Sequence, residues 1–316
     1  METLSARAVV FDEPRHLKLA RLELSDPQPG DVVVETEFSG VSTGTERLLW
    51  SGDMPFFPGL SYPLVPGYET VGRVVRSDER PDLVGRRVFA GGARCYKAAS
   101  GLFGATASRL VLPADKVIPI SFENDDEAVL LALAATAYHA VAGSAPPELI
   151  VGHGVLGRLL ARICIALGAP TPVVWEINPE RGDADGYPVI EPELDGRVDY
   201  ARICDVSGDP TILDKLIAAL APGGEITLAG FYSKPLGFAF PPAFMKEARI
   251  RVAAEWKPQD LAAVVGLIDA GKLSLGGLIT HRFDPADAEE AYRVAFEDPA
   301  CLKLVLDWRK RDVRTI

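Results

Sequence analysis

The sequence predicts an α/β protein in which a β-rich domain is split around a doubly wound parallel-sheet domain. Short β-branched runs between turn residues fill roughly the first 120 positions, strands and helices alternate after them, and the tail returns to mixed structure. The 316 residues suffice for two domains, since one domain usually holds roughly 100–200 residues. We expect residues 1–120 with 271–316 to form one domain and residues 121–270 the other.

The first domain is predicted from partly alternating β-branched segments. These are RAVVFDE, LKLARLEL and DVVVETEFSGVS, followed by GRVVR, GRRVFAG and SRLVLPADKVIPI. Turn residues separate them, at 27–30 and again at 63–67. Because few long helical periods occur here, we expect an all-β, barrel-like module.

The second domain is predicted from a change to alternating strands and helices. DDEAVLLALAATAYHAV has helical spacing with acids in its first turn, where the helix dipole favours them. ELIVGHGVLGRLLARICIALGAPTPVVWEIN then gives strand, glycine-rich turn, helix and strand, and the segments up to RIRVAAEW repeat the alternation. This order predicts a parallel doubly wound sheet. In the tail, PQDLAAVVGLIDAGKL and DPADAEEAYRVAFED predict helices, while GLITHRF and CLKLVLDW predict strands.

Charge, cysteine content and hydropathy limit the partners and the location. A formal net charge of -11 disfavours binding to nucleic acid or anionic membranes. The four cysteines form no CxxC pair, which fits a reducing cytoplasm, and charges at the N-terminus are unlike a signal peptide. The longest uncharged apolar run, Ala128 to Gly143, is shorter than the ~18–20 residues of a membrane span. We expect a cytoplasmic protein without stable membrane insertion.

A glycine-rich loop predicts a dinucleotide site. The segment Gly152-His153-Gly154-Val155-Leu156-Gly157 matches GxGxxG, follows an apolar strand and opens a helix. Its glycines would permit the tight turn, the approach of the pyrophosphate and the close packing of helix on strand. The helix N-terminus would bind the phosphates through free N–H groups. We expect all six residues to contact the cofactor; the alternative for His153 is a solvent-facing loop residue.

Glu176 predicts the identity of the cofactor. It ends the strand PVVWEIN about twenty residues past the motif, where an acid hydrogen-bonds the adenosine ribose and repels a 2′-phosphate. NAD is therefore expected, although the nearby Arg181 keeps NADP open. Because ligands bind at the carboxyl ends of the strands, Ser207-Gly208 and Ala229-Gly230 are expected at the nicotinamide end.

The order of the parts and PGYETVGRV (66–74) resemble the medium-chain dehydrogenase/reductase superfamily, which implies a GroES-like first domain, a Rossmann second domain and a cleft between them. Tyr68 stands where that family has a zinc-binding histidine, and Ser42 or Thr43 where it has a zinc-binding cysteine. The third ligand would fall at 131–134, which holds neither Cys nor His, and the four-cysteine structural lobe is absent. We expect no metal, since catalytic zinc needs three protein ligands.

Without zinc, another group must stabilise the alkoxide and take its proton. Tyr68 is the first candidate, because it occupies a lost ligand position. Thr45 matches the family's proton-relay hydroxyl if one inserted residue is allowed, Glu69 is retained from the family motif, and His281 lies in the returning tail. For each, the alternative is structural: Tyr68 fills the vacated volume, Thr45 bonds local backbone, and Glu69 and His281 serve the fold.

Aromatic residues predict a large, flat, apolar substrate or, alternatively, core and dimer contacts. They gather in FYSKPLGFAFPPAFM and at Trp50, Phe56, Phe57 and Tyr62. Long strings such as VGHGVLGRLLAR and GVSTGTERLLWSGDMPFFPGLSYPLVPGYE resemble the bacteriochlorophyllide a dehydrogenase family over essentially the whole chain. This resemblance implies NAD-dependent oxidation of a 3-(1-hydroxyethyl) group on a chlorophyllide-type tetrapyrrole to 3-acetyl. Arg47 and Lys234 are candidates for the propionate contact.

Two other functions stay open at this stage. Zinc-free members of the superfamily also reduce quinones or enoyl groups with NADPH, which Glu176 disfavours. A pigment-binding carrier that kept the fold without the chemistry is the non-enzymatic alternative. The superfamily resemblance also suggests a homodimer.

Overall fold

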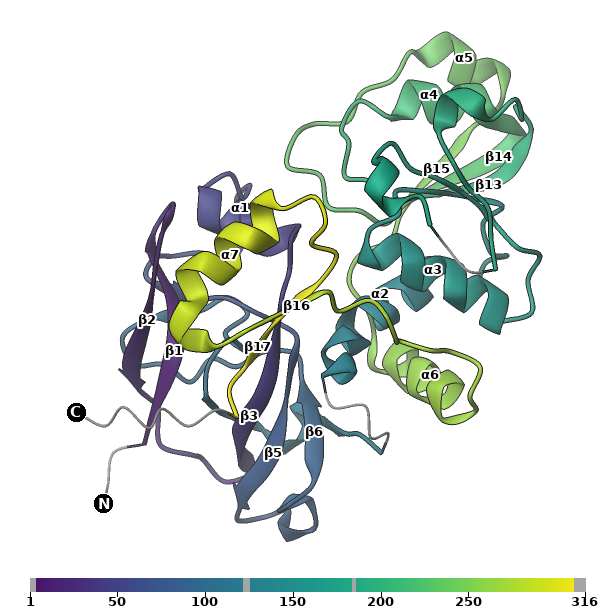
Figure 1. Cartoon of the computed structure of the whole chain (residues 1–316). Coiled ribbons are helices and arrows are strands. Elements are labelled where there is room, and N and C mark those ends of the chain that lie inside the picture. The colour runs from purple at the N-terminus through teal and green to yellow at the C-terminus, as the bar shows by residue number, and fades with distance from the viewer. Residues whose placement is uncertain (1–3, 122–125, 184–185, 310–316) are drawn as a thin grey trace. The chain divides into compact units, whose positions relative to one another are not determined.

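The computed structural model describes residues 4–121, 126–183 and 186–309, and the chain divides into two compact units. Unit 1 consists of Met1–Leu131 and Gly276–Ile316, and unit 2 of Ala132–Leu275 (Figure 1). The sequence-based borders at 120 and 270 lie slightly earlier than these. The predicted α/β class is confirmed, with mixed sheets in unit 1 and a parallel sheet in unit 2.

Two sheets form unit 1 in the described part of the chain. The smaller has the strand order β2-β1-β4-β7, and the larger has β16-β17-β3-β5-β6-β9 with β8 also paired to β3. The strand bounds are β1 Ser5–Glu13, β2 His16–Glu23, β3 Asp31–Val41, β4 Leu64–Val65, β5 Thr70–Ser77, β6 Arg87–Ala90, β7 Ser100–Gly101, β8 Arg109–Pro113, β9 Val117–Pro119, β16 His281–Phe283 and β17 Leu304–Asp307.

Strand β3 connects the parts of unit 1. Its sequence DVVVETEFSGV is rich in β-branched residues, and Val32, Val34 and Phe38 are buried. It pairs with β5 along most of its length, with β8 at its start and with β17 at Phe38 to Val41. β3 therefore attaches β17 of the C-terminal segment to strands β5 and β8 from the first part of the chain.

Two helices cover the core of unit 1. Helix α7 contacts β2 and β17, and Figure 1 shows it beside the strands of this unit. Phe11 and Tyr292 meet edge to face with ring centroids 5.5 Å apart, and Leu49 of α1 belongs to the same core cluster. The helix bounds are α1 Thr45–Ser51 and α7 Ala288–Glu297, with 3-10 turns at η1 Pro81–Leu83, η2 Ala114–Lys116, η3 Glu127–Leu130 and η6 Pro285–Asp287.

Unit 2 contains the predicted parallel sheet, in the order β12-β11-β10-β13-β14-β15. Every adjacent pair is parallel. From β10 the chain continues to β11 and β12 on one side, and from β13 to β14 and β15 on the other. The topological switch point, where such sheets bind ligands, therefore lies between β10 and β13. The strand bounds are β10 Leu149–Val151, β11 Val173–Trp175, β12 Val189–Ile190, β13 Tyr200–Asp205, β14 Leu220–Leu228 and β15 Arg249–Val252.

Helices α3 and α4 of unit 2 contact this sheet, at β10 and β14. In α3 the buried residues include Leu159, Leu160 and Ile163, a spacing that puts them on one helix face. No helix in the described residues is long and apolar enough to span a membrane. The helix bounds are α2 Leu131–Val141, α3 Val155–Ala166, α4 Leu213–Ala219, α5 Phe240–Met245 and α6 Pro258–Asp269, with 3-10 turns at η4 Pro179–Arg181 and η5 Pro192–Leu194.

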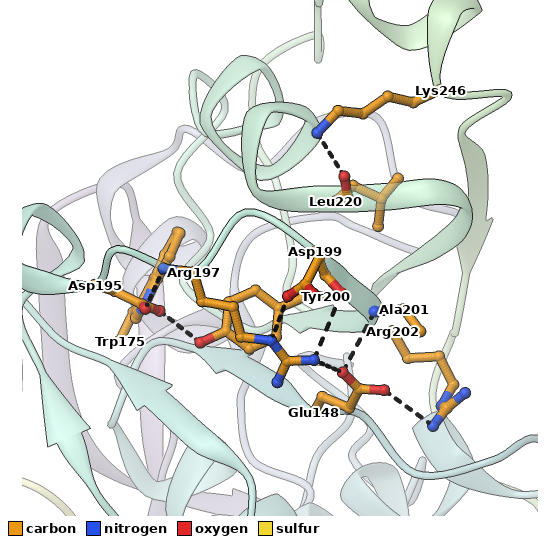
Figure 2. A network of polar contacts seen from close by, with 10 residues as sticks. All are labelled: Glu148, Trp175, Asp195, Arg197, Asp199, Tyr200, Ala201, Arg202, Leu220 and Lys246. Carbon is orange, nitrogen blue, oxygen red and sulfur yellow. Dashed lines mark hydrogen bonds and ion pairs between the residues drawn. The ribbon is translucent and has the colours of Figure 1, made fainter.

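Figure 2 shows a polar network that fixes the start of β13. Arg197 forms ion pairs with Glu148 and with Asp199, and its guanidinium lies 4.2 Å from the centroid of the Tyr200 ring. The Tyr200 hydroxyl donates to Asp195 Oδ2 over 2.5 Å. These contacts join residues 195–200 to Glu148, at the point where the chain enters β13.

The short distance between the backbones of β5 and β3 at Gly72 gives a first prediction. A Cβ on Gly72 would lie 2.2 Å from the carbonyl oxygen of Glu35, so the paired strands would have to separate. We expect Gly72→Ala to lower the free energy of unfolding by about 1–3 kcal/mol.

Gly266→Ala is the matched control for this substitution. Gly266 is exposed in α6, where an added Cβ meets nothing within 4 Å, and alanine should raise stability by roughly 0.5–1 kcal/mol. Melting temperatures measured by circular dichroism should move in opposite directions for the two variants. Equal shifts would contradict the role given to Gly72.

Candidate active site

Tyr68 and Ser42 meet in unit 1; the sequence resemblance put Tyr68 at one zinc-ligand position and Ser42 or Thr43 at another. The Tyr68 hydroxyl donates to Ser42 Oγ over 2.7 Å. The antiparallel pairing of β3 with β5, which includes Ser39 opposite Thr70, brings the end of one strand beside the turn that precedes the other. Burial and the charge of Glu69 raise the pKa of Tyr68 above its ordinary range, so the phenol stays protonated at neutral pH.

Glu46 is a buried acid directly behind this hydroxyl pair. It lies in the first turn of α1 and is 0% exposed. Its Oε1 accepts the Ser42 backbone N–H over 2.9 Å, and its Oε2 accepts the Tyr292 hydroxyl over 2.7 Å. Burial raises the pKa of Glu46 to about 7, although both hydrogen bonds act in the opposite direction. The sequence analysis did not identify this residue.

Glu69 forms a buried ion pair with Lys303, which arrives from the C-terminal segment just before β17. Both side chains are almost fully buried. Gly40 makes the space, because a Cβ there would lie 2.4 Å from Glu69 Oε2. Burial raises the pKa of Glu69, and the Lys303 ammonium opposes that shift. Sequence analysis missed Lys303, although a single lysine inside the apolar run CLKLVLDW was the available signal.

Thr45 joins the hydroxyl pair, whereas His281 does not. The Thr45 backbone N–H donates to Ser42 Oγ over 3.4 Å, and a hydrogen bond from its side chain lowers the pKa of Tyr68, against the effect of burial. His281 Nδ1 lies 2.9 Å from Thr280 Oγ1, and its Nε2 lies 3.7 Å from Asp298. The histidine thus contacts its own segment rather than Tyr68, and its catalytic role stays a prediction.

Three aromatic rings form a continuous surface at Tyr68, which we call the aromatic wall: Phe57, Phe103 and Tyr68. Phe103 meets Tyr68 edge to face at a centroid distance of 5.3 Å and meets Phe57 at 6.1 Å. All three rings are half-buried. The neighbouring Phe56 is 94% exposed. Sequence analysis missed Phe103.

Two other aromatic residues of the sequence prediction serve the core. Trp50 packs on Phe296 with centroids 5.6 Å apart, and the Tyr62 hydroxyl bonds the carbonyl of Leu49. Of the aromatic residues predicted in this part of unit 1, Phe57 therefore belongs to the aromatic wall, whereas Trp50 and Tyr62 have structural contacts.

The side chains at the former ligand positions do not suit zinc. Tyr68 and Ser42 hydrogen-bond each other, and Glu69 is neutralised by Lys303. Within residues 4–121, 126–183 and 186–309, no group of three or more His, Cys, Asp or Glu side chains could hold a metal ion. Zinc sites use nitrogen, sulfur or carboxylate ligands, whereas Tyr68 and Ser42 offer hydroxyl groups and the Glu69 carboxylate is already paired.

The glycine-rich loop of unit 2 has the geometry of a diphosphate cradle. A Cβ on Gly157 would lie 1.9 Å from the Gly152 carbonyl oxygen, so helix α3 approaches the strand as the motif requires. Gly154 caps α3, and a Cβ there would meet only Arg181, at 3.9 Å. Val155 and Leu156 begin the helix. The open space over Gly154 at a helix N-terminus fits a dinucleotide phosphate.

His153 is buried rather than solvent-facing, so that alternative was wrong. The residue is 0% exposed; its Nδ1 lies 2.6 Å from the Arg181 carbonyl and its Nε2 lies 2.8 Å from the Tyr187 hydroxyl. Burial lowers the pKa of this ring. Both ring nitrogens have protein partners, and His153 thereby ties the glycine-rich loop to the segment after β11. A cofactor contact of His153 stays a prediction.

Glu176 is held in place by backbone amides. Its Oε2 accepts the His153 N–H, and its Oε1 accepts the N–H groups of Ile177 and Asn178, each over 2.8 Å. The carboxylate is thereby fixed at the end of β11, beside the glycine-rich loop.

The two segments predicted for the nicotinamide end meet around Asp205. Its carboxylate accepts the Ser207 N–H over 2.9 Å and the Tyr232 hydroxyl over 2.5 Å, while its carbonyl accepts the N–H groups of Ala229 and Gly230. Burial raises the pKa of this acid. Ser207-Gly208 and Ala229-Gly230 are therefore neighbours at the carboxyl ends of β13 and β14. Neither Asp205 nor Tyr232 was identified from the sequence.

Comparison with known proteins places these features in a family context. Residues 28–122 match the alcohol dehydrogenase GroES-like domain. The chain is 54% identical to a 2-desacetyl-2-hydroxyethyl bacteriochlorophyllide A dehydrogenase from Cereibacter sphaeroides, over 96% of this chain and 98% of the relative. It is 52% identical to a protein of the same name from Rhodobacter capsulatus, over 97% and 99%.

Solved structures agree on the fold. A short chain alcohol dehydrogenase from E. coli complexed with NADH aligns with a TM-score of 0.82 at 21% identity, covering 96% of this chain and 99% of that one. L-idonate 5-dehydrogenase from E. coli aligns with a TM-score of 0.84 at 17% identity and the same coverage.

The Glu69–Lys303 pair generates a stability prediction. Lys303→Met leaves a buried carboxylate without its cation, and we expect a loss of about 3–5 kcal/mol in the free energy of unfolding. The double variant Glu69→Gln/Lys303→Met removes both charges and should recover much of that loss. Urea denaturation of the two variants and the parent measures the difference. If the single and double variants were equally unstable, packing rather than charge would explain the effect of Lys303.

Proposed function

The chain belongs to the family of 2-desacetyl-2-hydroxyethyl bacteriochlorophyllide A dehydrogenases, and we propose that it oxidises the 3-(1-hydroxyethyl) group of a bacteriochlorophyllide to 3-acetyl in bacteriochlorophyll synthesis. The family resemblance seen in the sequence motifs is confirmed. The chain is thus an alcohol-acting oxidoreductase of the medium-chain dehydrogenase/reductase superfamily. The substrate proposal rests on 54% and 52% sequence identity to two relatives of that name, over nearly the full length of the chain.

A nicotinamide cofactor follows from the dehydrogenase relatives, and we propose that it is NAD. When bound, it accepts hydride from the carbinol carbon of the substrate. Gly152, Gly154 and Gly157 would hold the diphosphate. The fixed carboxylate of Glu176 supports NAD, because its negative charge would repel a 2′-phosphate. Ser207-Gly208 and Ala229-Gly230 would border the nicotinamide.

We propose that Tyr68 hydrogen-bonds the hydroxyl group of the substrate. Its own hydrogen points to Ser42, so the phenol oxygen keeps a lone pair for the O–H of the alcohol. Thr45 lies next to this pair and would orient it. Glu69 would act indirectly, because its buried carboxylate is paired with Lys303. His281 has no contact that supports a place in this mechanism.

The aromatic wall supports a large conjugated substrate. Half-buried rings beside the reacting hydroxyl offer a face for a flat macrocycle, and such rings contribute both burial and stacking. Arg47 lies two residues after Thr45 in α1, is exposed, and has no ion-pair partner among the described residues, which makes it the better candidate for the propionate in unit 1. Lys234 is the corresponding candidate in unit 2.

The proposal includes a homodimer and a cytoplasmic location. β15 is an edge strand of the unit 2 sheet, and Phe240, Met245 and Val252 near it are 68%, 76% and 73% exposed. A second copy would cover such an apolar surface. The four cysteines are free and buried, which fits a reducing compartment. A net charge of -11 supports a small-molecule substrate rather than nucleic acid.

The overall proposal predicts a coupled spectral change. Purified, metal-analysed protein mixed with 3-hydroxyethyl bacteriochlorophyllide and NAD should shift the pigment absorbance in step with NADH formation, without zinc. NADP should support the reaction at least about tenfold less well, given one repulsive acid at the ribose. Tight pigment binding without any shift would favour the carrier, and a strong preference for NADPH would favour a quinone or enoyl reductase.

The assignment of Tyr68 and the aromatic wall predicts two different kinetic defects. Tyr68→Phe removes the hydroxyl and should lower kcat by about 10²–10³-fold, as loss of a hydrogen bond to a reacting oxygen does. Phe103→Ala keeps the hydroxyl and should raise the pigment KM by roughly tenfold, the loss expected for one aromatic contact.

Leu194→Ala, which truncates an exposed side chain in η5 of unit 2, is the control and should change neither parameter. If Tyr68→Phe turned over at the parent rate, the oxygen partner would be wrong. If Phe103→Ala left the pigment KM unchanged, the wall would be structural.

A further inference from the structure

Glu46 is a buried acid for which the proposed mechanism gives no role. It is 0% exposed and has no ion-pair partner in the described part of the chain. Two other buried acids have ion-pair partners: Glu69 pairs with Lys303, and Asp260 pairs with His139. The buried Asp205 of unit 2 resembles Glu46, since it accepts hydrogen bonds from Ser207 and Tyr232 and has no ion pair among the described residues. A carboxyl group without a cation is costly to bury, so its retention beside the reacting hydroxyls requires an explanation.

One residue joins Glu46 to the reacting hydroxyl. Ser42 accepts the Tyr68 hydroxyl at Oγ over 2.7 Å and donates its backbone N–H to Glu46 Oε1 over 2.9 Å. Ser42 therefore lies between Tyr68 and Glu46 and contacts both. We propose that Glu46 accepts the proton released in alcohol oxidation, through Ser42 and Tyr68. This inference rests on the proposed function.

The transfer balances without a further reactant. The C–H bond of the carbinol breaks and its electron pair leaves with the hydrogen to the nicotinamide, while the alcohol O–H proton passes to the Tyr68 oxygen. The Tyr68 hydrogen moves to Ser42 Oγ, and the Ser42 hydrogen moves to Glu46 Oε1. Two electrons and a hydrogen have then left the substrate as hydride, and one proton rests on Glu46. After product release the proton returns along the same groups to water at the half-buried Tyr68.

The surroundings of Glu46 suit a reversible proton acceptor. The groups facing it are Tyr292 from α7, Glu69 from the turn before β5, Lys303 from the segment before β17, and Tyr68. Burial and the charge of Glu69 disfavour the carboxylate, while Lys303 and the Tyr292 hydroxyl favour it. The balance raises the pKa of Glu46 to about 7, near the value at which a base exchanges protons effectively at neutral pH. Glu46 acts through other residues and does not touch the substrate.

The kinetic test compares pH profiles of full-length protein with pigment and NAD. In the parent, kcat should fall below an apparent pKa near 7. Glu46→Gln should lower kcat at pH 8 at least about tenfold, remove this acid limb, and leave both KM values within about twofold. Glu290→Gln, an exposed acid on α7, is the matched control and should preserve rate and profile.

Tyr292→Phe provides a second variant that keeps Glu46. It removes a hydrogen bond that favours the carboxylate, so the acid limb should move to higher pH. A Glu46→Gln enzyme with the parent rate and the parent acid limb would overturn the inference, as would a Tyr292→Phe profile that stays in place. An inactive parent protein would overturn the proposed function itself, and the two failures are thereby distinguished.

A stability measurement tests the titration without activity. Because the pKa of Glu46 is raised from 4.5 to about 7, the folded protein holds this proton more tightly than the unfolded chain. The parent should therefore lose stability relative to Glu46→Gln as pH rises from 4.5 to 7, by up to about two orders of magnitude in the unfolding equilibrium constant. A pH-independent difference would show that Glu46 does not titrate in this range and would overturn the inference.

Discussion

The active end of unit 1 depends on one buried ion pair. An opposite charge and hydrogen bonds reduce the cost of burying a carboxylate, and Glu69 finds that charge in Lys303. The two residues lie in segments far apart in sequence, so the pair fixes the returning tail against the turn before β5. Gly40 leaves the space that the pair fills. Tyr68 precedes Glu69 directly, and its position beside Ser42 follows from this anchoring.

The same ion pair determines the charge balance of the site. Glu46 and Glu69 are both buried in unit 1, and Lys303 is the cation that faces them. Burial raises the pKa of Glu46 to about 7, the charge of Glu69 adds to this shift, and Lys303 opposes it. A metal ion would supply positive charge directly, whereas here the protein stores a proton on Glu46.

Unit 2 uses buried polar groups in a comparable way. His153 ties the glycine-rich loop to the segment after β11, and Asp205 ties the loops after β13 and β14 to each other. In both cases backbone N–H or carbonyl groups are partners, so these hydrogen bonds restrict the conformations of the loops. Preorganised loops reduce the conformational entropy lost on binding. His153 and Asp205 thus have structural roles that their positions in a loop and at a strand end would not by themselves indicate.

The sequence by itself determined the fold class, the glycine-rich loop and the family, because each depends on local period, on glycine spacing or on long shared strings. It also identified Tyr68, since the residue stands in a motif whose expected member is missing. It did not identify Lys303, Glu46, Phe103 or Asp205, and it left His153 open to a solvent-facing role that was wrong. The function of these residues comes from partners distant in sequence: Lys303 meets Glu69, Tyr292 meets Glu46, and Tyr187 meets His153. Burial and long-range pairing arise only when strands and helices assemble, and they decide which charged side chain is structural and which one titrates.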